Sequence, residues 1–350
     1  MEFCGVPNDK NYSTTVHNDP VAVAYPTSAQ QVAGRCRRWG AQNLEVVARS
    51  GGHSYIANGL GGNNGSLVVD LSKLKAVTIR SSNNTAIIET GNRLGMYYGR
   101  HTAEHGNTNT FAASNIPPEF GAELVFSKGP SNSHITLGWT GAYYGSPSTF
   151  NATLAPYLKT LPKPSWSTIS PGSYINSVSV LAATFEHEHR TRCVRHILHQ
   201  IAHDPRGSPM SAAAIKAFVT YMANQGFTSN TNWFVEVELY GGSNSAINAV
   251  PLDSTAFAKR DTLFTIQLYA SSASGSPPYP AAGFTFLDGM VASIVSNSPA
   301  NWSYGAYLNY ADNRLANATT LYYGSHYPRL VSIKSKVDPK DIFRFPIGVA

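Results

Sequence analysis

The sequence predicts an α+β protein built from two domains. A chain of 350 residues is longer than most single domains. Near its N-terminus a strand, a helix and a second strand follow one another, which is typical of an α/β unit. From Phe120 onward strands alternate with amphipathic helices, and some strands follow each other as hairpin-like pairs. This second pattern predicts an antiparallel sheet with helices on one face.

Short apolar runs predict the N-terminal strands, and a capping-box spacing predicts the helix between them. Ser28 and Gln31 have the Ser-x-x-Gln spacing of a capping box, which begins a helix. The apolar face of that helix is predicted from the spacing of Val32, Cys36 and Trp39. The predicted strands lie at 21–25, 44–48, 67–71 and 85–89.

The C-terminal elements follow from alternating and helical apolar patterns. A helix capped by Ser211 is expected to bury Ile215, Phe218, Val219 and Met222. Another helix at 327–336 is expected to carry Leu330 and Ile333 on one face. The remaining predicted helix lies at 284–295, and the predicted strands lie at 123–126, 138–144, 233–240, 263–269 and 304–310.

A glycine-rich loop, residues 49–55, follows the strand at 44–48 and has the sequence Arg-Ser-Gly-Gly-His-Ser-Tyr. Two consecutive glycines let the backbone turn tightly and approach a ligand closely. Their amide N–H groups can point at phosphate oxygens, and His53 adds a nucleophile. The loop is therefore interpreted as an anion-binding loop with a reactive histidine. A Gly-Gly-His run taken alone also fits an ordinary turn with a surface histidine.

Seven residues in this order after a strand resemble the flavin-attachment loop of the FAD-linked oxidases in the vanillyl-alcohol-oxidase superfamily. The resemblance is closest to the berberine-bridge-enzyme-like group, and within it to the fungal oligosaccharide oxidases. It implies an incomplete PCMH-type FAD-binding domain and FAD bonded covalently through His53. Tyr55 falls where the family has a tyrosine near the flavin. The other cofactor-binding residues implied are Arg49, Ser50, Gly51, Gly52 and Ser54.

A second motif, Asn-Tyr-Ala-Asp at 309–312, resembles the family's Asn-Tyr-x-Asp motif, which makes Tyr310 the implied catalytic base. Glu238 stands where the oligosaccharide oxidases place an acidic residue that assists this tyrosine, although here it is Glu instead of Asp. The implied reaction oxidises the anomeric hydroxyl of an oligosaccharide to a lactone, with O2 as acceptor. Without the resemblance, such a tyrosine reads as a packing residue and such a glutamate as solvent-facing. Trp233 and Phe234 are either a sugar-stacking platform or core aromatics.

The resemblance breaks after Gly106. Family members continue there into a motif whose cysteine forms a second bond to the flavin, and into the rest of the FAD domain. The implied domains are an N-terminal FAD-binding part at 1–110, a substrate domain at 111–325 and a segment at 326–350 that returns to the FAD domain. The gap is expected to uncover the strands at 67–71 and 85–89. An inactive, sugar-binding remnant or a misannotated gene model is the alternative to an active oxidase.

Composition excludes several classes of function. The net charge of +6 is not gathered in Lys/Arg blocks, so no nucleic-acid partner is expected. No apolar run reaches about 18 residues, so no membrane span is expected. Six Asn-x-Ser/Thr sequons and a charged fraction of only 13% favour a secreted glycoprotein, although the first residues lack signal-peptide features. Three cysteines leave at least one unpaired, and pairing of Cys4 with Cys36 stays open.

A histidine-rich stretch at 186–203 invites a zinc interpretation, because His196, His199 and His203 follow Cys193 at helical spacings. No Cys-x-x-Cys or His-Glu-x-x-His frame accompanies them, so no metal site is predicted. Another reading frame through 200–204 gives a segment that resembles the family. Residues 187–205 are therefore also open to interpretation as a frame-shifted stretch of the gene.

Overall fold

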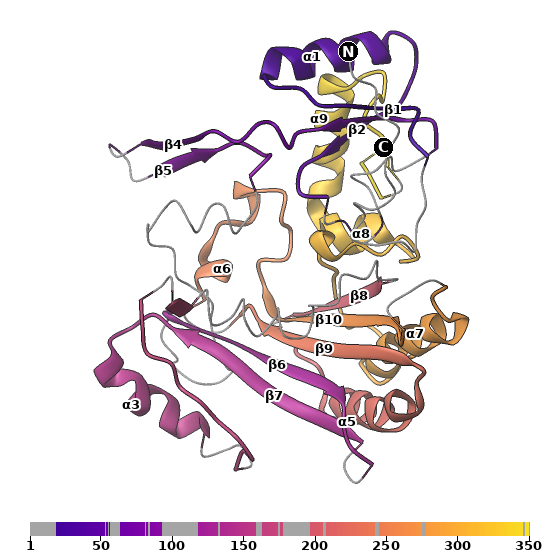
Figure 1. The fold of residues 1–350 in the computed structure, drawn as a ribbon. Helices are drawn as coiled ribbons and strands as arrows, with labels where there is room; N and C mark the ends of the chain where they lie inside the picture. Colours follow the sequence, from indigo (N-terminus) through magenta and orange to yellow (C-terminus); the bar gives the residue numbers. More distant parts are fainter. Residues whose placement is uncertain are drawn as a thin grey trace.

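The computed structural model describes residues 19–52, 54, 56, 64–80, 82, 85–92, 118–131, 134–158, 163–173, 176–177, 197–205, 208–241, 245–274, 278–345 and 347–349; at 156–158 and 197–205 it describes the backbone alone. Figure 1 shows the N-terminal elements together with helix α9 (Tyr327–Val337) on one side of a five-stranded sheet. Helices α5 (Ala212–Tyr221) and α7 (Ala281–Val295) lie on the other side. The α+β prediction is confirmed.

The N-terminal unit is the predicted strand–helix–strand. Its strands β1 (Ala22–Ala24), β2 (Val46–Arg49) and β3 (Leu67–Asp70) form a parallel sheet in the order β1-β3-β2, and helix α1 spans Ala29–Gly40. Ser28 caps the helix, because its side chain accepts a hydrogen bond of 3.3 Å from the Gln31 amide. The Gln31 side chain reaches back to the amide of Thr27, one residue before the position that a capping box would use.

Strand β3 is not uncovered, so that part of the expectation about the gap was wrong. All four of its residues are buried, because it pairs with β1 and β2 on its two sides. Val32, Cys36 and Trp39 of α1 pack on Leu67 and its neighbours, as their helical spacing predicted. Cys36 is a free thiol.

The hairpin of β4 (Val77–Arg80) and β5 (Thr85–Ile88) carries the exposed apolar surface that was expected near the gap. It projects away from the other elements in Figure 1. Ile79 is 57% exposed and Ile88 is 37% exposed. In the strand register Ile79 lies opposite Ala86 and Ile88 opposite Val77, so both isoleucines lie on one face of the hairpin. An apolar two-stranded edge of this kind favours self-association.

Replacing Ile79 and Ile88 together with threonine is expected to reduce aggregation and leave the melting temperature nearly unchanged. Exposed substitutions alter stability by less than about 0.5 kcal/mol, whereas removal of apolar edge surface weakens intermolecular contact. Light scattering during a thermal ramp measures both effects. Ile266→Thr is the matched control, because Ile266 is fully buried and its loss should lower the melting temperature by several degrees. Unchanged aggregation of the double variant would show that the hairpin face is covered in solution.

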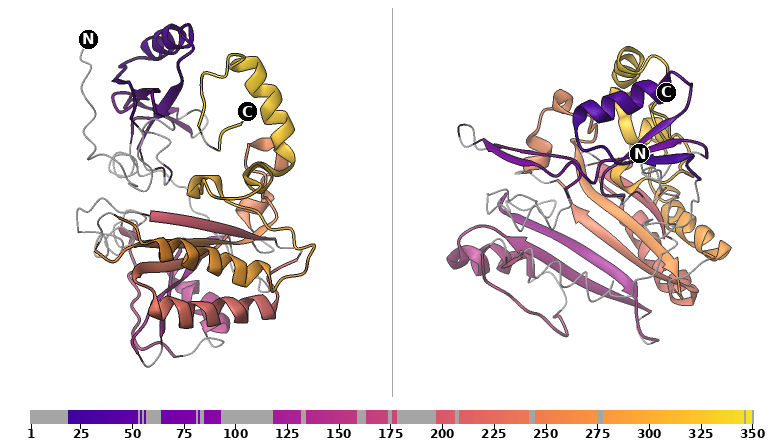
Figure 2. Two further views of the ribbon diagram at one scale, coloured as in Figure 1. Left: turned by 90° about the vertical axis from the view of Figure 1, so that its right-hand side faces the viewer. Right: turned by 45° about the horizontal axis from the view of Figure 1, so that its top comes forward.

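The second sheet has five antiparallel strands in the order β7-β6-β9-β10-β8. Its strands are β6 (Phe120–Lys128), β7 (Ile135–Tyr143), β8 (Ile197–Pro205), β9 (Thr231–Leu239) and β10 (Thr262–Ser272). Its helices are α3 (Pro147–Leu158), α5 (Ala212–Tyr221) and α7 (Ala281–Val295). Side chains of these helices pack on a single face of the sheet, as Figure 2 shows for α5 and α7. The prediction of an antiparallel sheet with helices on one face is confirmed.

Alternation along β9 separates the core from the opposite face. Trp233 and Val235 point toward α5 and α7 and are buried with Phe286 in the main core. Phe234, Glu236 and Glu238 therefore point to the other face, which is turned toward the N-terminal elements (Figure 1). Trp233 is thus a core residue and takes no part in a sugar platform.

The end of the chain returns to the N-terminal unit. After α8 (Ala318–Tyr323) and α9 (Tyr327–Val337), the carbonyl of Ile342 accepts a hydrogen bond of 2.8 Å from the amide of Val46 on β2. The Asp338 carboxylate holds the intervening turn by accepting from the amides of Ile342 and Phe343 at 2.8 and 2.9 Å. Ile342 also packs over Gly40 at the end of α1, where a Cβ would collide with it.

Three local expectations were wrong. Residues 304–310 do not form a strand: after an isolated bridge at Gly305, residues Leu308–Tyr310 form a 3₁₀ turn. Ile215 is 47% exposed, because α5 buries the stripe formed by Ala214, Phe218 and Met222. Ile333 on α9 is 45% exposed, although Leu330 packs as predicted.

Shorter elements join these layers: helix α6 (Ala246–Ala249), 3₁₀ turns at Leu252–Ser254 and Gly324–His326, and a π turn at Met222–Gly226 that extends α5. Each helix in the described part of the chain is too short or too polar to cross a bilayer. Among these short elements, α6 and the turn at Leu252–Ser254 matter most for the site, because residues 245–261 form a wall beside the C-terminal end of β9.

Candidate active site

Tyr310 and Glu238, 72 residues apart in the chain, are brought together on the sheet face opposite the helices. The Tyr310 hydroxyl donates a hydrogen bond of 3.0 Å to Glu238 Oε1. Glu238 is placed by the alternation of β9, and Tyr310 by the 3₁₀ turn after Tyr307. The Tyr310 ring packs against the buried Tyr269 of β10, which fixes its position over the sheet.

Two further carboxylates share this face. Glu123 on β6 lies directly opposite Glu238 in the strand register, and Glu236 lies two residues before Glu238 on β9. Carboxylate oxygens of the three side chains lie within 4.8 Å of one another. Thr265 and Gln267 of β10 lie opposite Glu238 and Glu236, so the cluster is flanked by polar side chains. Like charges at such separations resist simultaneous ionisation.

The environment moves the pKa of Glu238 from 4.5 to about 7. Burial is the main cause, since it disfavours the charged carboxylate, and the negative charge of Glu123 acts in the same direction. Hydrogen bonds from Tyr310 and Tyr240 oppose the rise. Burial also raises the pKa of Glu123. Near neutral pH Glu238 can therefore both hold and release a proton.

An aromatic pair lies beside the carboxylates. The rings of Phe234 and Tyr269 stack with their centroids 4.2 Å apart and their planes at 15°, and Tyr310 packs on the same pair. All three belong to the face that carries Glu238. Stacked aromatic faces next to hydrogen-bonding groups suit a sugar ring, which has apolar C–H faces and polar edges. Phe234, unlike Trp233, therefore stays a candidate for the sugar platform.

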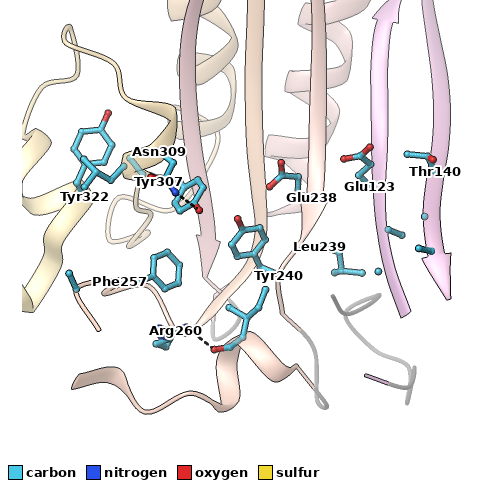
Figure 3. A pocket seen from close by; sticks show the side chains of 18 of the residues that line it. Glu123, Thr140, Glu238, Leu239, Tyr240, Phe257, Arg260, Tyr307, Asn309 and Tyr322 are labelled. Carbon is cyan, nitrogen blue, oxygen red and sulfur yellow. Dashed lines mark hydrogen bonds between the residues drawn. The ribbon is translucent and has the colours of Figure 1, made fainter. Parts of the chain in front are cut away.

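A cavity of about 740 Å³ opens beside Glu238 (Figure 3). It lies between the ends of β6, β7 and β9 and the loop after α6. Its lining includes Glu123, Glu238, Tyr240, Phe257, Arg260, Tyr307, Asn309 and Tyr322. The Asn309 side chain donates a hydrogen bond of 2.6 Å to the Tyr307 hydroxyl, which orders one wall. A cavity of this size accommodates a small ligand.

The glycine-rich loop leaves the carboxyl end of β2, an edge where parallel sheets commonly bind ligands. Among the described residues, a Cβ built on Gly51 meets no atom within 4 Å, so these residues leave its backbone open to a ligand. Gly52 has a φ of 70°, a conformation that glycine adopts without strain. Ser54 is partly buried. His53 and Tyr55 lie outside the described residues, so their predicted roles stay predictions.

Two residues of the loop are used to hold it in place. The Arg49 guanidinium is buried, forms an ion pair of 3.3 Å with Asp70 of β3 and lies against Gly52. The Ser50 hydroxyl donates to the carbonyl of Thr90. Arg49 is thus turned into the protein instead of standing open to solvent. These contacts tie the loop to Asp70 of β3 and to Thr90.

The zinc interpretation required a helix, and the structure has a strand. His199 and His203 lie on β8, which pairs with β10 over its whole length, so their spacing is not helical. His196 and Cys193 lie outside the described residues. The strand assignment does not test the frame-shift hypothesis.

Two family models match the chain. The model described as "FAD binding domain" matches residues 20–118, which contain the glycine-rich loop. The model described as "Berberine and berberine like" matches residues 306–350, which contain Tyr310 and the segment that returns to β2. Both matches agree with the resemblance of this chain to the berberine-bridge-enzyme-like group of FAD-linked oxidases.

Relatives within this group are named as oligosaccharide oxidases. The chitooligosaccharide oxidase of Gibberella zeae is 25% identical and the match covers 97% of this chain and 89% of the relative. The glucooligosaccharide oxidase of Sarocladium strictum is 24% identical, with the same coverage. The first alignment runs over 451 positions against a chain of 350 residues, so more than 100 positions of that relative have no counterpart. This chain is therefore internally shorter than that relative, and the place of the gap after Gly106 stays a prediction.

Solved structures of the same oxidases share the fold. A chitooligosaccharide oxidase superposes with a TM-score of 0.82 at 21% identity, and the match covers 98% of this chain and 94% of the other. A glucooligosaccharide oxidase from Acremonium strictum, described with a 6-S-cysteinyl, 8α-N1-histidyl FAD, has a TM-score of 0.77 at 23% identity, with the same coverage. The PCMH-type FAD-binding fold with a sheet-based substrate domain is therefore confirmed.

Sequence reasoning missed several residues of the site. Glu123, Glu236, Tyr240 and Tyr269 were not singled out, although Glu236 and Glu238 share the strand spacing of two that puts both on one face. Glu123 could not be found this way, because only the pairing of β6 with β9 places it opposite Glu238.

Proposed function

We propose that this protein is an FAD-dependent carbohydrate oxidase that oxidises the anomeric hydroxyl of an oligosaccharide to a lactone, with O2 as the final acceptor. The observation that carries the proposal is the 3.0 Å hydrogen bond from Tyr310 to Glu238 on the sheet face opposite the helices. Relatives that are oligosaccharide oxidases support the carbohydrate substrate.

Oxidation of a hydroxyl carbon requires removal of the hydroxyl proton. Tyr310 takes that proton from the sugar, and its own phenolic proton passes along the existing hydrogen bond to Glu238. Glu238 is suited to receive it because its pKa of about 7 lies near neutral pH. Tyr240 donates a second hydrogen bond to Glu238 and so helps to orient the carboxylate. Phe234, which stacks on the buried Tyr269, supports the sugar ring beside Tyr310.

The glycine-rich loop fits FAD. Open backbone at Gly51 and the positive φ of Gly52 provide amides that can meet a pyrophosphate at the end of β2. Arg49 and Ser50 hold this loop from behind. When bound, FAD supplies the two-electron acceptor for the oxidation. We include a covalent bond through His53 in the proposal, supported by the histidyl-linked FAD of the glucooligosaccharide oxidase.

Turnover is expected to rise with pH through the pKa of Glu238. Only the ionised carboxylate can receive the proton from Tyr310, so a pKa of about 7 leaves roughly one molecule in a hundred competent at pH 5. We therefore expect turnover to increase by about a hundredfold between pH 5 and pH 8. In Glu238→Gln the rate should be low and independent of pH in this range, as steady-state kinetics will measure.

Stability should change in the opposite direction, which separates the two effects. The pKa of Glu238 is higher in the folded protein than its ordinary value of 4.5, so the folded state binds more protons between pH 4.5 and pH 7. This contribution to stability is present at low pH and is lost as the pH rises through about 7. If turnover falls together with the melting temperature as the pH rises, the proposed role of Glu238 is contradicted.

An inactive, sugar-binding remnant is the second candidate, favoured by the exposed apolar hairpin of β4 and β5. The visible spectrum of the purified protein decides between them. A yellow colour that survives acid precipitation supports the oxidase. A colourless, folded protein that binds oligosaccharides but does not oxidise them supports the remnant.

Secretion and glycosylation are also part of the proposal. The asparagines of four sequons, at Asn64, Asn151, Asn301 and Asn317, are exposed, which allows a glycan at each. A loss of mass on treatment of the fungal-expressed protein with an N-glycosidase checks this, and an unchanged mass would contradict it.

A further inference from the structure

The cavity beside Glu238 has an arginine at its other side. Figure 3 shows Arg260 next to Phe257, while Glu123 and Glu238 lie on the strands across the pocket. Arg260 is the single Lys or Arg side chain among the described residues that line the cavity. The pocket therefore has a positive side and an acidic side.

The guanidinium of Arg260 is held in place but is not neutralised. Nη1 donates to the carbonyl of Ile247 at 3.3 Å, and Nη2 donates to the Thr255 hydroxyl at 2.8 Å. The Phe257 ring lies 4.9 Å below Cζ. Among the described residues, these two bonds leave three of its five N–H groups unused, and the buried Nε has no hydrogen-bond partner there.

Three other arginines in the described part of the chain are paired with acids. Arg49 pairs with Asp70, Arg314 with Asp288 and Arg344 with Glu45. Within the same described ranges no carboxylate lies at ion-pair distance from Arg260, which is partly buried. A partly buried cation without an acid is costly unless an anion from outside completes it. Its position in a ligand-sized cavity makes the ligand the source of that anion.

We propose that Arg260 binds a carboxylate of the substrate, so that the cavity selects an acidic oligosaccharide that contains a uronic acid unit. This proposal rests on the proposed function for the sugar class. The guanidinium fork matches the two oxygens of a carboxylate. The ligand would place its carboxylate at Arg260 and its neutral, reducing sugar toward Glu238 and Tyr310.

A carboxylate fits better than a phosphate. Glu123 and Glu238 face the same cavity, and a doubly charged group would be repelled by them more strongly than a singly charged one. The phosphates of FAD are assigned to the loop at 49–52 in the N-terminal layer, so they do not account for Arg260. A volume of about 740 Å³ is enough for a short oligosaccharide.

The test compares two disaccharides that differ in a single group. Cellobiouronic acid carries a carboxylate where the non-reducing ring of cellobiose carries a hydroxymethyl group. Titration calorimetry on the purified protein at pH 7 should give an affinity for the acid that is roughly tenfold or more above that for cellobiose. The preference should shrink as salt is added. Equal affinities in the parent protein overturn the proposal, even if every variant misfolds.

Substitutions of Arg260 test whether this residue causes the preference for the acidic disaccharide. Arg260→Gln should bind both disaccharides equally, and Arg260→Lys should keep part of the preference because it keeps the charge. Arg314→Gln is the matched control, since Arg314 also lies 4.9 Å from a phenylalanine ring, that of Phe284, but pairs with Asp288 outside the cavity. A preference that survives in Arg260→Gln overturns the proposal.

Two further measurements exclude other anions. Tighter binding of cellobiose 6′-phosphate than of cellobiouronic acid would overturn the choice of carboxylate. Loss of bound flavin from Arg260→Gln would assign Arg260 to the cofactor and overturn the proposal as well. Binding and oxidation are measured separately, so the two proposals fail separately. If the protein prefers the acidic disaccharide but oxidises no sugar, the proposed oxidase function is rejected. If it oxidises cellobiose but does not prefer the acid, the proposed role of Arg260 is rejected.

Discussion

Tyr310→Phe should lower the turnover of sugar by roughly a hundred- to ten-thousand-fold, which is the range that a positioned base contributes. The change removes the hydroxyl that donates to Glu238 at 3.0 Å and leaves the ring packed on Tyr269. Sugar binding should therefore change little. Steady-state kinetics will show a loss in kcat with a nearly constant KM.

Tyr143→Phe provides the control for this prediction. The Tyr143 hydroxyl is also hydrogen-bonded to a side chain, Thr149 at 2.8 Å, but it packs with α3 on the helix-covered side of the sheet. Its removal should leave kcat unchanged. If Tyr310→Phe oxidises sugar at the parent rate, Tyr310 is not the base, and the assignment of Glu238 as proton acceptor fails with it.

His53→Ala should release all acid-stable flavin from the polypeptide. The resemblance assigns the covalent bond to His53, and no cysteine of this chain occupies the family's second attachment motif. After acid precipitation, the flavin should appear in the supernatant of the variant and in the pellet of the parent protein. Absorbance of the two fractions measures the change.

Cys36→Ser tests the alternative attachment. Cys36 is a free thiol that packs between α1 and β3, and burial raises the pKa of its thiol. That environment makes it a poor nucleophile, so the serine variant should retain its covalent flavin. Covalent flavin that persists in His53→Ala would instead identify a bond through a cysteine.

Local patterns predicted most of the secondary structure. The alternation in β9 and β10 and the helical stripe of α1 depend on burial of one face, which the sequence shows directly. The same signals failed at 304–310, because alternating apolar and polar residues also occur in a 3₁₀ turn that packs on α8 and β10. The prediction that Ile215 is buried was wrong for a related reason, since a shift of one position along a helix rotates a side chain by about 100°.

Sequence alone was enough for the resemblance to the family, for the glycine-rich loop, and for Tyr310 and Glu238 as the pair to consider, because short motifs preserve the chemistry of a site in a local order of residues. The contacts of the site follow from tertiary structure: Tyr310 bonds to Glu238, Glu123 lies opposite Glu238 on the neighbouring strand, and no carboxylate of the described residues pairs with Arg260. Tertiary structure also decided that β3 is covered and the β4–β5 hairpin is not. Strand order and register set these contacts, and both depend on pairing between segments far apart in the chain, which no local pattern encodes.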